Sequence, residues 1–399
     1  FIFPKVTYVS NITDIDDKII EAAVEQNVEI SVITKKFTKI YNEDMAKLNV
    51  LAPDVQPKAT EYIPEMIDLI KELIEKDFAY EKDGHVLFHV PTYENYGKLS
   101  NRIKDEQIAG SRVDVADFKK DPADFVLWKP STGVQPGWES PWGIGRPGWH
   151  TECSAMSEKT LGLPLDIHGG GRDLIFPHHE NEIAQSCCTA AENSNPESYA
   201  KYWMHNGFVT IDGEKMSKSL GNIILVNELT QKYHGEVIRL ALLSTHYRQA
   251  LDWNDNVIHQ AKKLLDKLYS LLNELNDVKG SKEPDNHLIE ILLDDLNTPG
   301  LMANINKLLK NAESLEEGDK PNLKSNLLLI GKLMGILEDK SYNQISSEFK
   351  DKVDNLIEDR SNAKKKRDFE LADKIRSELI DLGVEINDSP EGTTWKVVK

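Results

Sequence analysis

Residue types that bind transition metals gather in the middle of the sequence. His178 and Glu182 are four positions apart in a segment with a helical pattern, so one helix face could present an imidazole nitrogen and a carboxylate oxygen to a metal ion. Cys153, further upstream, could add a thiolate, and a Cys, His and Glu set suits zinc with one tetrahedral position left open. A buried histidine with surface acids on an ordinary helix would give the same spacing, but other reactive residues nearby favour the metal site.

A glycine triplet lies shortly before this segment. The apolar residues 165–167 predict a short strand, after which His168 opens a predicted loop that contains Gly169, Gly170 and Gly171. Glycines let a ligand approach the backbone more closely than any side chain would permit. Asp173 could accept hydrogen bonds from ribose hydroxyls. A triplet of this kind is a weak signal by itself, because most glycine runs only mark turns.

Two lysines three positions apart lie on a Ser/Gly-rich loop within residues 212–222. Lys215 and Lys218 could bring positive charge to a polyphosphate as charge develops in a transition state. An arbitrary Lys/Ser loop would only be solvated, but the complete string is highly specific. The sequence therefore predicts a nucleotide site beside the metal site.

Composition excludes several classes of protein. The 399 residues carry a formal net charge of -18, which argues against a DNA-coating protein, and no apolar run is long enough to cross a membrane. Three cysteines, two of them neighbours, exclude a disulfide framework and favour a reducing, cytoplasmic compartment. Between residues 360 and 376, seven basic and three acidic side chains give a local charge of +4; from charge alone this patch is a solvated helix face.

Hydrophobic periodicity predicts the elements that position these residues. In chain order we expect a short strand over 4–12, a helical stretch over 16–48, an amphipathic helix over 63–74, a hairpin over 79–90, an irregular region rich in Gly, Pro and Trp over 91–147, and almost wholly helical structure beyond 226 with a polar interruption at 276–285.

The sequence resembles the cysteinyl-tRNA synthetases, a family of class I aminoacyl-tRNA synthetases. The matching strings occur in the family's order and span nearly the whole chain: residues 11–18, 124–129, 141–143, 148–156, 168–171, 176–185, 203–205 and 215–219. The resemblance implies an α/β fold, with a nucleotide-binding parallel sheet, an inserted domain, an α-helical bundle and a small C-terminal anticodon-binding module. We expect the catalytic domain in 1–60 and 141–225, the insertion in 61–140, the bundle in 226–340 and the module in 341–399.

The resemblance also implies roles for individual residues. Cys153, His178 and Glu182 would be zinc ligands, with one zinc ion per chain, and the zinc would bind the thiolate of the substrate cysteine. Thr13, Trp149 and His168 would surround the amino acid. The glycine triplet with Asp173 would hold the ATP ribose, His205 would lie close to the nucleotide, and Lys215 with Lys218 would steady the phosphates.

By the same resemblance, ATP with Mg²⁺, L-cysteine and tRNA(Cys) are the substrates. Cysteine would first be activated as cysteinyl-adenylate and then transferred to the terminal adenosine of the tRNA. The C-terminal module would meet the anticodon, with Phe369 stacking on a base and Asp373 and Asp388 reading base edges. A monomer is the family's usual state.

Two features of the family pattern are absent from the sequence. The family has an upstream strand with a further zinc-binding Cys, followed by a His-Ile-Gly-His signature that contacts ATP. The non-Met start at Phe1 favours a chain that continues upstream in the native enzyme, by about 55 residues on the size of a strand–helix unit. A truncated product without activity is the competing explanation.

Three other functions share parts of this sequence pattern. A cysteine ligase of mycothiol synthesis shares the catalytic core but does not need the helical and basic C-terminal part. A non-catalytic tRNA-binding relative would bind tRNA without ATP turnover. A zinc peptidase is set aside because the His-Glu-x-x-His order does not occur.

Overall fold

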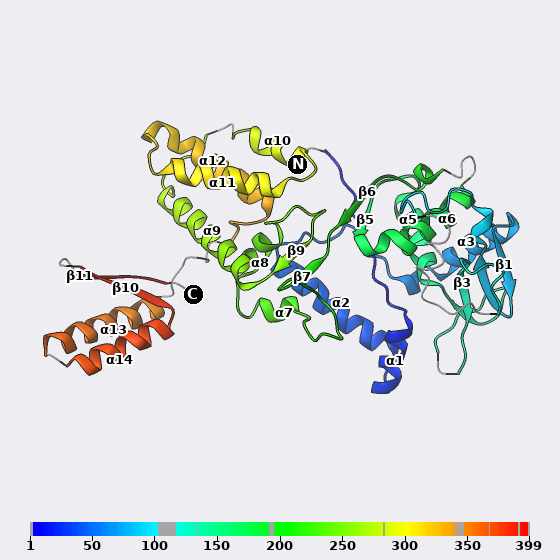
Figure 1. The fold of residues 1–399 in the computed structure, drawn as a ribbon, viewed down its shortest axis with the longest axis horizontal. Helices are drawn as coiled ribbons and strands as arrows, with labels where there is room; N and C mark the ends of the chain where they lie inside the picture. Colours follow the sequence, from blue (N-terminus) through cyan, green and yellow to red (C-terminus); the bar gives the residue numbers. More distant parts are fainter. Residues whose placement is uncertain are drawn as a thin grey trace.

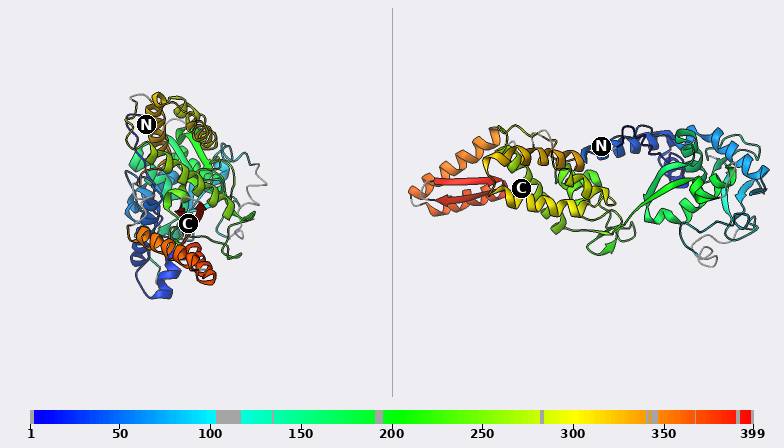
Figure 2. Two further views of the ribbon diagram at one scale, coloured as in Figure 1. Left: turned by 90° about the vertical axis from the view of Figure 1, so that its left-hand side faces the viewer. Right: turned by 90° about the horizontal axis from the view of Figure 1, so that it is seen from above.

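The computed structural model describes residues 3–102, 117–133, 135–190, 195–281, 284–339, 342, 347–366, 368–389 and 392–397. The molecule is elongated, with the sheet of β1 to β4 near one end and the two-helix module of α13 and α14 at the other (Figure 1). Seen from above, α1 and α2 run along the middle of the molecule, between the two ends (Figure 2). No helix within these ranges is both long enough and apolar enough to cross a membrane.

The lobe that contains the sheet of β1 to β4 is built on the predicted amphipathic helix and the predicted hairpin. Both predictions are confirmed. Helix α3 (Ile63–Glu75) buries an apolar face that includes Met66, Ile70 and Leu73 against the lobe's core. Strands β1 (Ala79–Lys82) and β2 (His85–Phe88) form the hairpin, and β3 (Phe125–Pro130) and β4 (Gly145–Pro147) extend it into a four-stranded antiparallel sheet in the order β1-β2-β3-β4. The region after residue 90, predicted as irregular, therefore contributes two strands.

Two helices and a two-stranded parallel sheet position the predicted site. Helix α5 (Trp149–Leu161) packs against α6 (Glu180–Thr189), and β5 (Leu165–Gly171) pairs in parallel with β6 (Ala200–Asn206). The predicted glycine loop is wrong, because Gly169, Gly170 and Gly171 are the last three residues of β5. A Cβ atom at Gly169 would lie 3.0 Å from the Met204 carbonyl oxygen, so glycine permits this close pairing of the strands.

The first fifty residues differ from the prediction in two ways. Instead of a strand over 4–12, the segment forms isolated parallel bridges, Val9 with Val55 and Ile12 with Lys58. The helical stretch is two helices, α1 (Asp17–Gln26) and α2 (Ile30–Lys47). Asn27 separates them with a left-handed φ of 51°, which a continuous helix cannot contain.

The segment 212–222, which carries Lys215 and Lys218 and is called the lysine loop below, connects a small sheet to the helical part of the chain. Strands β8 (Glu214–Lys215), β7 (Val209–Ile211) and β9 (Leu251–Trp253) form a sheet in the order β8-β7-β9, with β7 and β9 parallel. Helices α7 (Val226–Leu229) and α8 (Gly235–Leu242) lie between β8 and β9 in the chain. Strand β9 thus interrupts the region that was expected to be almost wholly helical.

The remaining helices form the bundle and the terminal module. The bundle helices are α9 (Asp255–Glu274), α10 (His287–Leu293), α11 (Thr298–Ala312) and α12 (Lys320–Met334), and the polar stretch 276–285 separates α9 from α10 as predicted. The module packs α13 (Ser347–Lys365) and α14 (Phe369–Asp381) with the hairpin of β10 (Val384–Ser389) and β11 (Gly392–Val397). Single turns complete the structure: η1 (Ala59–Glu61), η2 (Val90–Thr92), η3 (Arg172–Leu174), η4 (Ile175–His179), η5 (Pro196–Ser198) and η6 (Glu317–Asp319).

Candidate functional site

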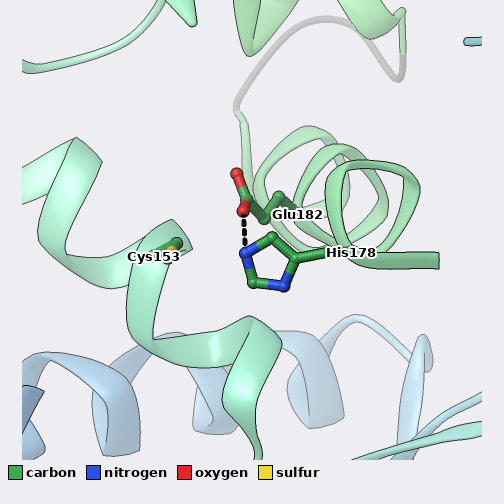
Figure 3. Close-up of side chains that lie close together, drawn as sticks. All are labelled: Cys153, His178 and Glu182. Atoms are coloured by element: carbon green, nitrogen blue, oxygen red, sulfur yellow. Dashed lines mark ion pairs between the residues drawn. The ribbon is translucent and has the colours of Figure 1, made fainter. Parts of the chain in front are cut away.

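The predicted metal ligands converge in the structure. Cys153 comes from α5, His178 from the turn η4 and Glu182 from α6, and their donor atoms all lie within 4.8 Å of one another. His178 Nε2 and Glu182 Oε1 are 2.6 Å apart (Figure 3). His178 and Glu182 are 4% and 0% exposed and Cys153 is half-buried, so two of the three ligands are removed from bulk water.

The donor set fits a zinc ion. Glu182 Oε1 is buried and accepts no hydrogen bond from the residues that the structure describes, although His178 Nε2 lies close to it. Two electron-pair donors and a thiol directed at one another are costly without a cation between them. Sulfur, nitrogen and oxygen donors from Cys, His and Glu are those that zinc binds in proteins.

A further layer of side chains orients these ligands. The Tyr199 hydroxyl donates to Glu182 Oε2 at 2.6 Å, and His168 Nε2 lies 2.8 Å from the same oxygen. The Nδ1 atoms of His150 and His178 are 2.8 Å apart, and Asn11 Nδ2 donates to Cys153 Sγ at 3.6 Å. Such contacts fix the orientation and basicity of metal ligands.

Electrostatics in the cluster work in opposite directions at two of the ligands. Burial opposes the ionisation of Glu182, but the neighbouring His168 and His178 outweigh it and hold its pKa well below the usual range. Burial, then the charges of Glu182 and Glu152, raise the pKa of the Cys153 thiol well above its usual range. A bound cation reverses this preference at a thiol, because metal coordination deprotonates it.

The three residues predicted to surround the amino acid differ from one another in how closely they approach the metal cluster. The ring of Trp149 stacks on His178 with 4.3 Å between centroids, and 46% of this tryptophan is exposed beside the cluster. His168 contacts Glu182, as described above. Thr13 is half-buried, two positions after Asn11, and no described contact joins its side chain to the cluster.

The predicted nucleotide-binding residues of this part of the chain lie at the end of β5, on β6 and in the turn η3 that follows β5. His205 is paired with Gly170 in the sheet register, and its Nε2 lies 2.8 Å from Nδ1 of His179. Burial, followed by electrostatic interactions with His168, Arg248 and Arg172, lowers the pKa of His205. Asp173 is exposed in η3, where its Oδ1 lies 2.4 Å from the position of a Cβ atom on Gly171.

The two loop lysines are exposed. Lys215 ends β8, and its Nζ lies 5.8 Å from the centroid of the Phe208 ring. Lys218 lies on the loop between β8 and α7. Among the described contacts, none joins either lysine to the metal cluster.

The three residues predicted to contact the anticodon have different surroundings. Phe369 is 63% exposed at the start of α14, and Asp373 is exposed on the same helix. The carboxylate of Asp388, on β10, accepts two 3.0 Å hydrogen bonds from Arg360 and others from Lys364 and Thr393. These partners, Arg360 foremost, hold the pKa of Asp388 far below its usual range.

Sequence reasoning did not single out Asn11, His150, His179 and Tyr199 as site residues. Asn11 and His150 lie within the strings that carry the family resemblance, at residues 11–18 and 148–156, so a signal for them was present. His179 adjoins a predicted ligand, and with His168 and Glu182 it forms a second group of donors within 4.8 Å. Tyr199 has no local signal, because only the packing of the chain before β6 brings it to Glu182.

The chain is similar to known proteins of one family. The family described as tRNA synthetases class I (C) catalytic domain matches residues 3–263. The cysteine--tRNA ligase of Parvibaculum lavamentivorans is 53% identical over 99% of this chain and 86% of its own length. The chain belongs to the cysteine--tRNA ligase family. The enzyme of the same name from Saccharophagus degradans is 49% identical over 99% of this chain and 87% of its own length.

Solved structures support the fold. A Mycobacterium tuberculosis methionyl-tRNA synthetase in complex with methionyl-adenylate has a TM-score of 0.53 at 15% identity, covering 82% of each chain. A second structure of that enzyme gives a TM-score of 0.51 at 15% identity, covering 83% of this chain and 84% of the other. The class I synthetase fold expected from the sequence is confirmed. The matches favour neither the amino-sugar ligase nor a non-catalytic relative.

Proposed function

We propose that the chain is a cysteine--tRNA ligase that activates L-cysteine with ATP and transfers the cysteinyl group to tRNA(Cys). The convergence of half-buried Cys153 with the buried His178 and Glu182 carries this proposal. A carboxylate oxygen of cysteine attacks the α-phosphorus of ATP, and the bond to pyrophosphate breaks. A ribose hydroxyl of the terminal adenosine of the tRNA then attacks the carbonyl carbon, and AMP leaves.

Selection of cysteine would depend on the metal cluster. Cys153, His178 and Glu182 would hold a zinc ion, which supplies a coordination position for the substrate thiolate that a protonated serine hydroxyl fills poorly. His168 and Tyr199 orient the Glu182 carboxylate, and the exposed face of Trp149 borders the cluster beside His178. A difference in one bond could then separate cysteine from serine without an editing domain.

The nucleotide would bind along β5 and β6 and below the lysine loop. Glycines at the end of β5 leave the backbone there without side chains, and the exposed Asp173 could accept from ribose hydroxyls. Lys215 and Lys218 would place positive charge near the phosphates, with Mg²⁺ bound to the ATP. Orientation and electrostatic stabilisation would supply most of the rate enhancement, since the protein forms no covalent bond to substrate.

The helical bundle and the terminal module would bind tRNA. The chain is acidic overall, but the exposed side chains of Lys365, Lys366, Lys374 and Arg376 concentrate positive charge on the module, with Phe369 exposed among them. Phosphate contacts from such side chains supply affinity, and an exposed aromatic ring can stack on an unpaired base. A soluble, cytoplasmic monomer is the proposed state.

Cysteine-dependent exchange of pyrophosphate into ATP tests the proposal. We expect exchange with cysteine and zinc and none with serine as the amino acid. The measurement is made on this chain and, in parallel, on a chain extended by a family-like N-terminal segment. Exchange that fails in both, or that proceeds equally with serine, would overturn the proposal.

A further inference from the structure

The side chain of Asn222 joins the two ends of the lysine loop, and within the loop Ser217 Oγ accepts a 3.3 Å hydrogen bond from the backbone N–H of Leu220. Asn222 Oδ1 accepts a 2.8 Å hydrogen bond from the backbone N–H of Ser217, and its Nδ2 donates to the backbone carbonyl of Lys215 at 3.2 Å. The amide at the end of the segment 215–222 therefore binds the backbone at its start, and Lys218 lies between Ser217 and Asn222 in the chain. A carboxamide suits this role because it offers a donor and an acceptor together.

A carboxylate anchors the base of the same loop. Oδ1 of Asp252, on β9, accepts from the backbone N–H of Gly213 at 2.6 Å and from the Thr210 hydroxyl at 2.8 Å. These bonds secure the β7–β8 turn, in which Asp212 and Gly213 have φ values of 49° and 79°. Lys215 lies two residues after Gly213 and pairs with Thr210 across the turn, so its backbone position depends on this anchor.

The anchor continues into the helical bundle. Asn254 Nδ2 donates to Asp252 Oδ2 at 3.1 Å, while Asn254 Oδ1 caps the first turn of α9 by accepting from Val257 N–H at 3.0 Å. The turn that leads to Lys215 is thereby hydrogen-bonded, through two side chains, to the N-terminus of a twenty-residue helix. A long helix is a firm support for a short exposed loop.

We propose that Asn222 and Asp252 are positioning residues for the proposed reaction, which fix the backbone that carries Lys215 and Lys218. This inference rests on the proposed function, because it assigns the phosphate-facing lysines their support. Neither residue needs to touch a substrate. Their effect arises because a lysine held in place loses less entropy on meeting the developing charge than one on a free loop.

The hydrogen bonds can be tested without catalysis. Trypsin cleaves after exposed lysines, and cleavage in a loop follows the population of its opened form when opening and closing are fast. We expect Asn222→Ala to speed cleavage after Lys215 and Lys218 by about 3- to 30-fold, the effect of losing two hydrogen bonds. Asn222→Asp keeps the acceptor for Ser217 but loses the donor to Lys215. Its cleavage rate should therefore fall between those of the wild type and Asn222→Ala. Asn256→Ala on α9, whose amide contacts only Gln260 among the described side chains, is the matched control.

A double-mutant cycle tests the positioning role. In pyrophosphate exchange, Asn222→Ala should lower kcat by about tenfold with little change in the KM for cysteine, and the loss should vanish when Lys218→Ala is also present. Asp252→Asn should likewise lower kcat, and this loss should vanish when Lys215→Ala is also present. Cleavage at the wild-type rate in Asn222→Ala, or a kcat loss that is equal with and without Lys218, would overturn the inference. Absence of exchange in the wild-type and extended chains would instead overturn the proposed function, while the cleavage rates would still decide whether the loop is held as described.

Discussion

The hydroxyl group of Tyr199 donates a 2.6 Å hydrogen bond to Oε2 of Glu182, and both side chains are fully buried. The other oxygen of the carboxylate faces His178. Tyr199 thus holds the carboxylate rotation that leaves Oε1 directed at the metal cluster. Hydrogen bonds of this kind tune metal sites almost as strongly as the ligands themselves.

Removing this hydroxyl should weaken metal binding without removing a ligand. We expect Tyr199→Phe to lower the zinc affinity by about 10- to 100-fold, because the carboxylate loses its orienting donor. Competition with a chromophoric chelator measures the affinity. Tyr202→Phe is the control, since Tyr202 is 69% exposed on the neighbouring strand. Equal affinities for the two variants would refute the assigned role.

Loss of the thiol should have a larger effect. Cys153→Ser replaces the thiolate with a hydroxyl that stays protonated, so zinc retention and cysteine-dependent exchange should be lost together. Metal content by mass spectrometry and the exchange assay provide the two readouts. Cys188→Ala, in the core on α6, should keep the metal. Stoichiometric zinc in Cys153→Ser would remove this residue from the site.

The last glycine of β5 offers a test of the nucleotide side. A Cβ atom on Gly171 would lie 2.4 Å from Asp173 Oδ1, the end of an exposed side chain that can swing away at little cost in stability. Gly171→Ala should therefore fold normally but raise the KM for ATP by about tenfold, the effect of one displaced hydrogen-bonding group. An unchanged KM would exclude Asp173 from ATP binding.

Gly235→Ala is the informative contrast, because its Cβ atom would lie 1.7 Å from the Lys47 backbone carbonyl. Backbone cannot yield as a side chain does. We expect this substitution to lower the free energy of unfolding by about 1–3 kcal/mol. Urea denaturation of the two variants separates the cases, and equal stabilities would contradict this interpretation of the two glycines.

Asp388 should contribute to the stability of the terminal module. Asp388→Ala leaves the guanidinium of Arg360, 5% exposed, without its bidentate partner, which should cost about 2–3 kcal/mol of unfolding free energy. Urea denaturation of the full chain provides the measurement. Asp373→Ala, at an exposed position on α14, should leave stability unchanged. If Asp388→Ala instead binds tRNA more weakly at unchanged stability, Asp388 acts on the RNA directly.

The same pair sets a dependence on pH. Arg360, Lys364 and Thr393 lower the pKa of Asp388 in the folded chain, so the native state binds its proton less readily than the unfolded chain does. The stabilisation is then fully present above the unfolded pKa of about 3.9 and is lost as the pH falls through the folded pKa. The stability difference between wild type and Asp388→Ala should therefore be constant from pH 6 to 8 and shrink below about pH 4.

Several elements could be predicted from local sequence because their cause is local. The apolar spacing in 63–74 specifies α3, and the alternation around Asp83 and Gly84 specifies the β1–β2 hairpin. The glycine triplet misled for a physical reason: glycine is permitted in a tight turn and equally in a strand whose partner approaches closely, and only the position of β6 distinguishes the two. The domain boundaries and the roles of the individual site residues remain predictions.

The sequence by itself determined the family, through an ordered set of strings, and placed His178 and Glu182 on one face of the chain through their spacing of four. Tertiary structure alone decided that Cys153 reaches them, because α5 packs against α6 although the two helices are separated in the sequence. It also decided that Tyr199, His150 and Asn11 complete the cluster. Residues close in sequence share a helix face by geometry, whereas residues far apart meet only where burial of apolar surface joins their elements.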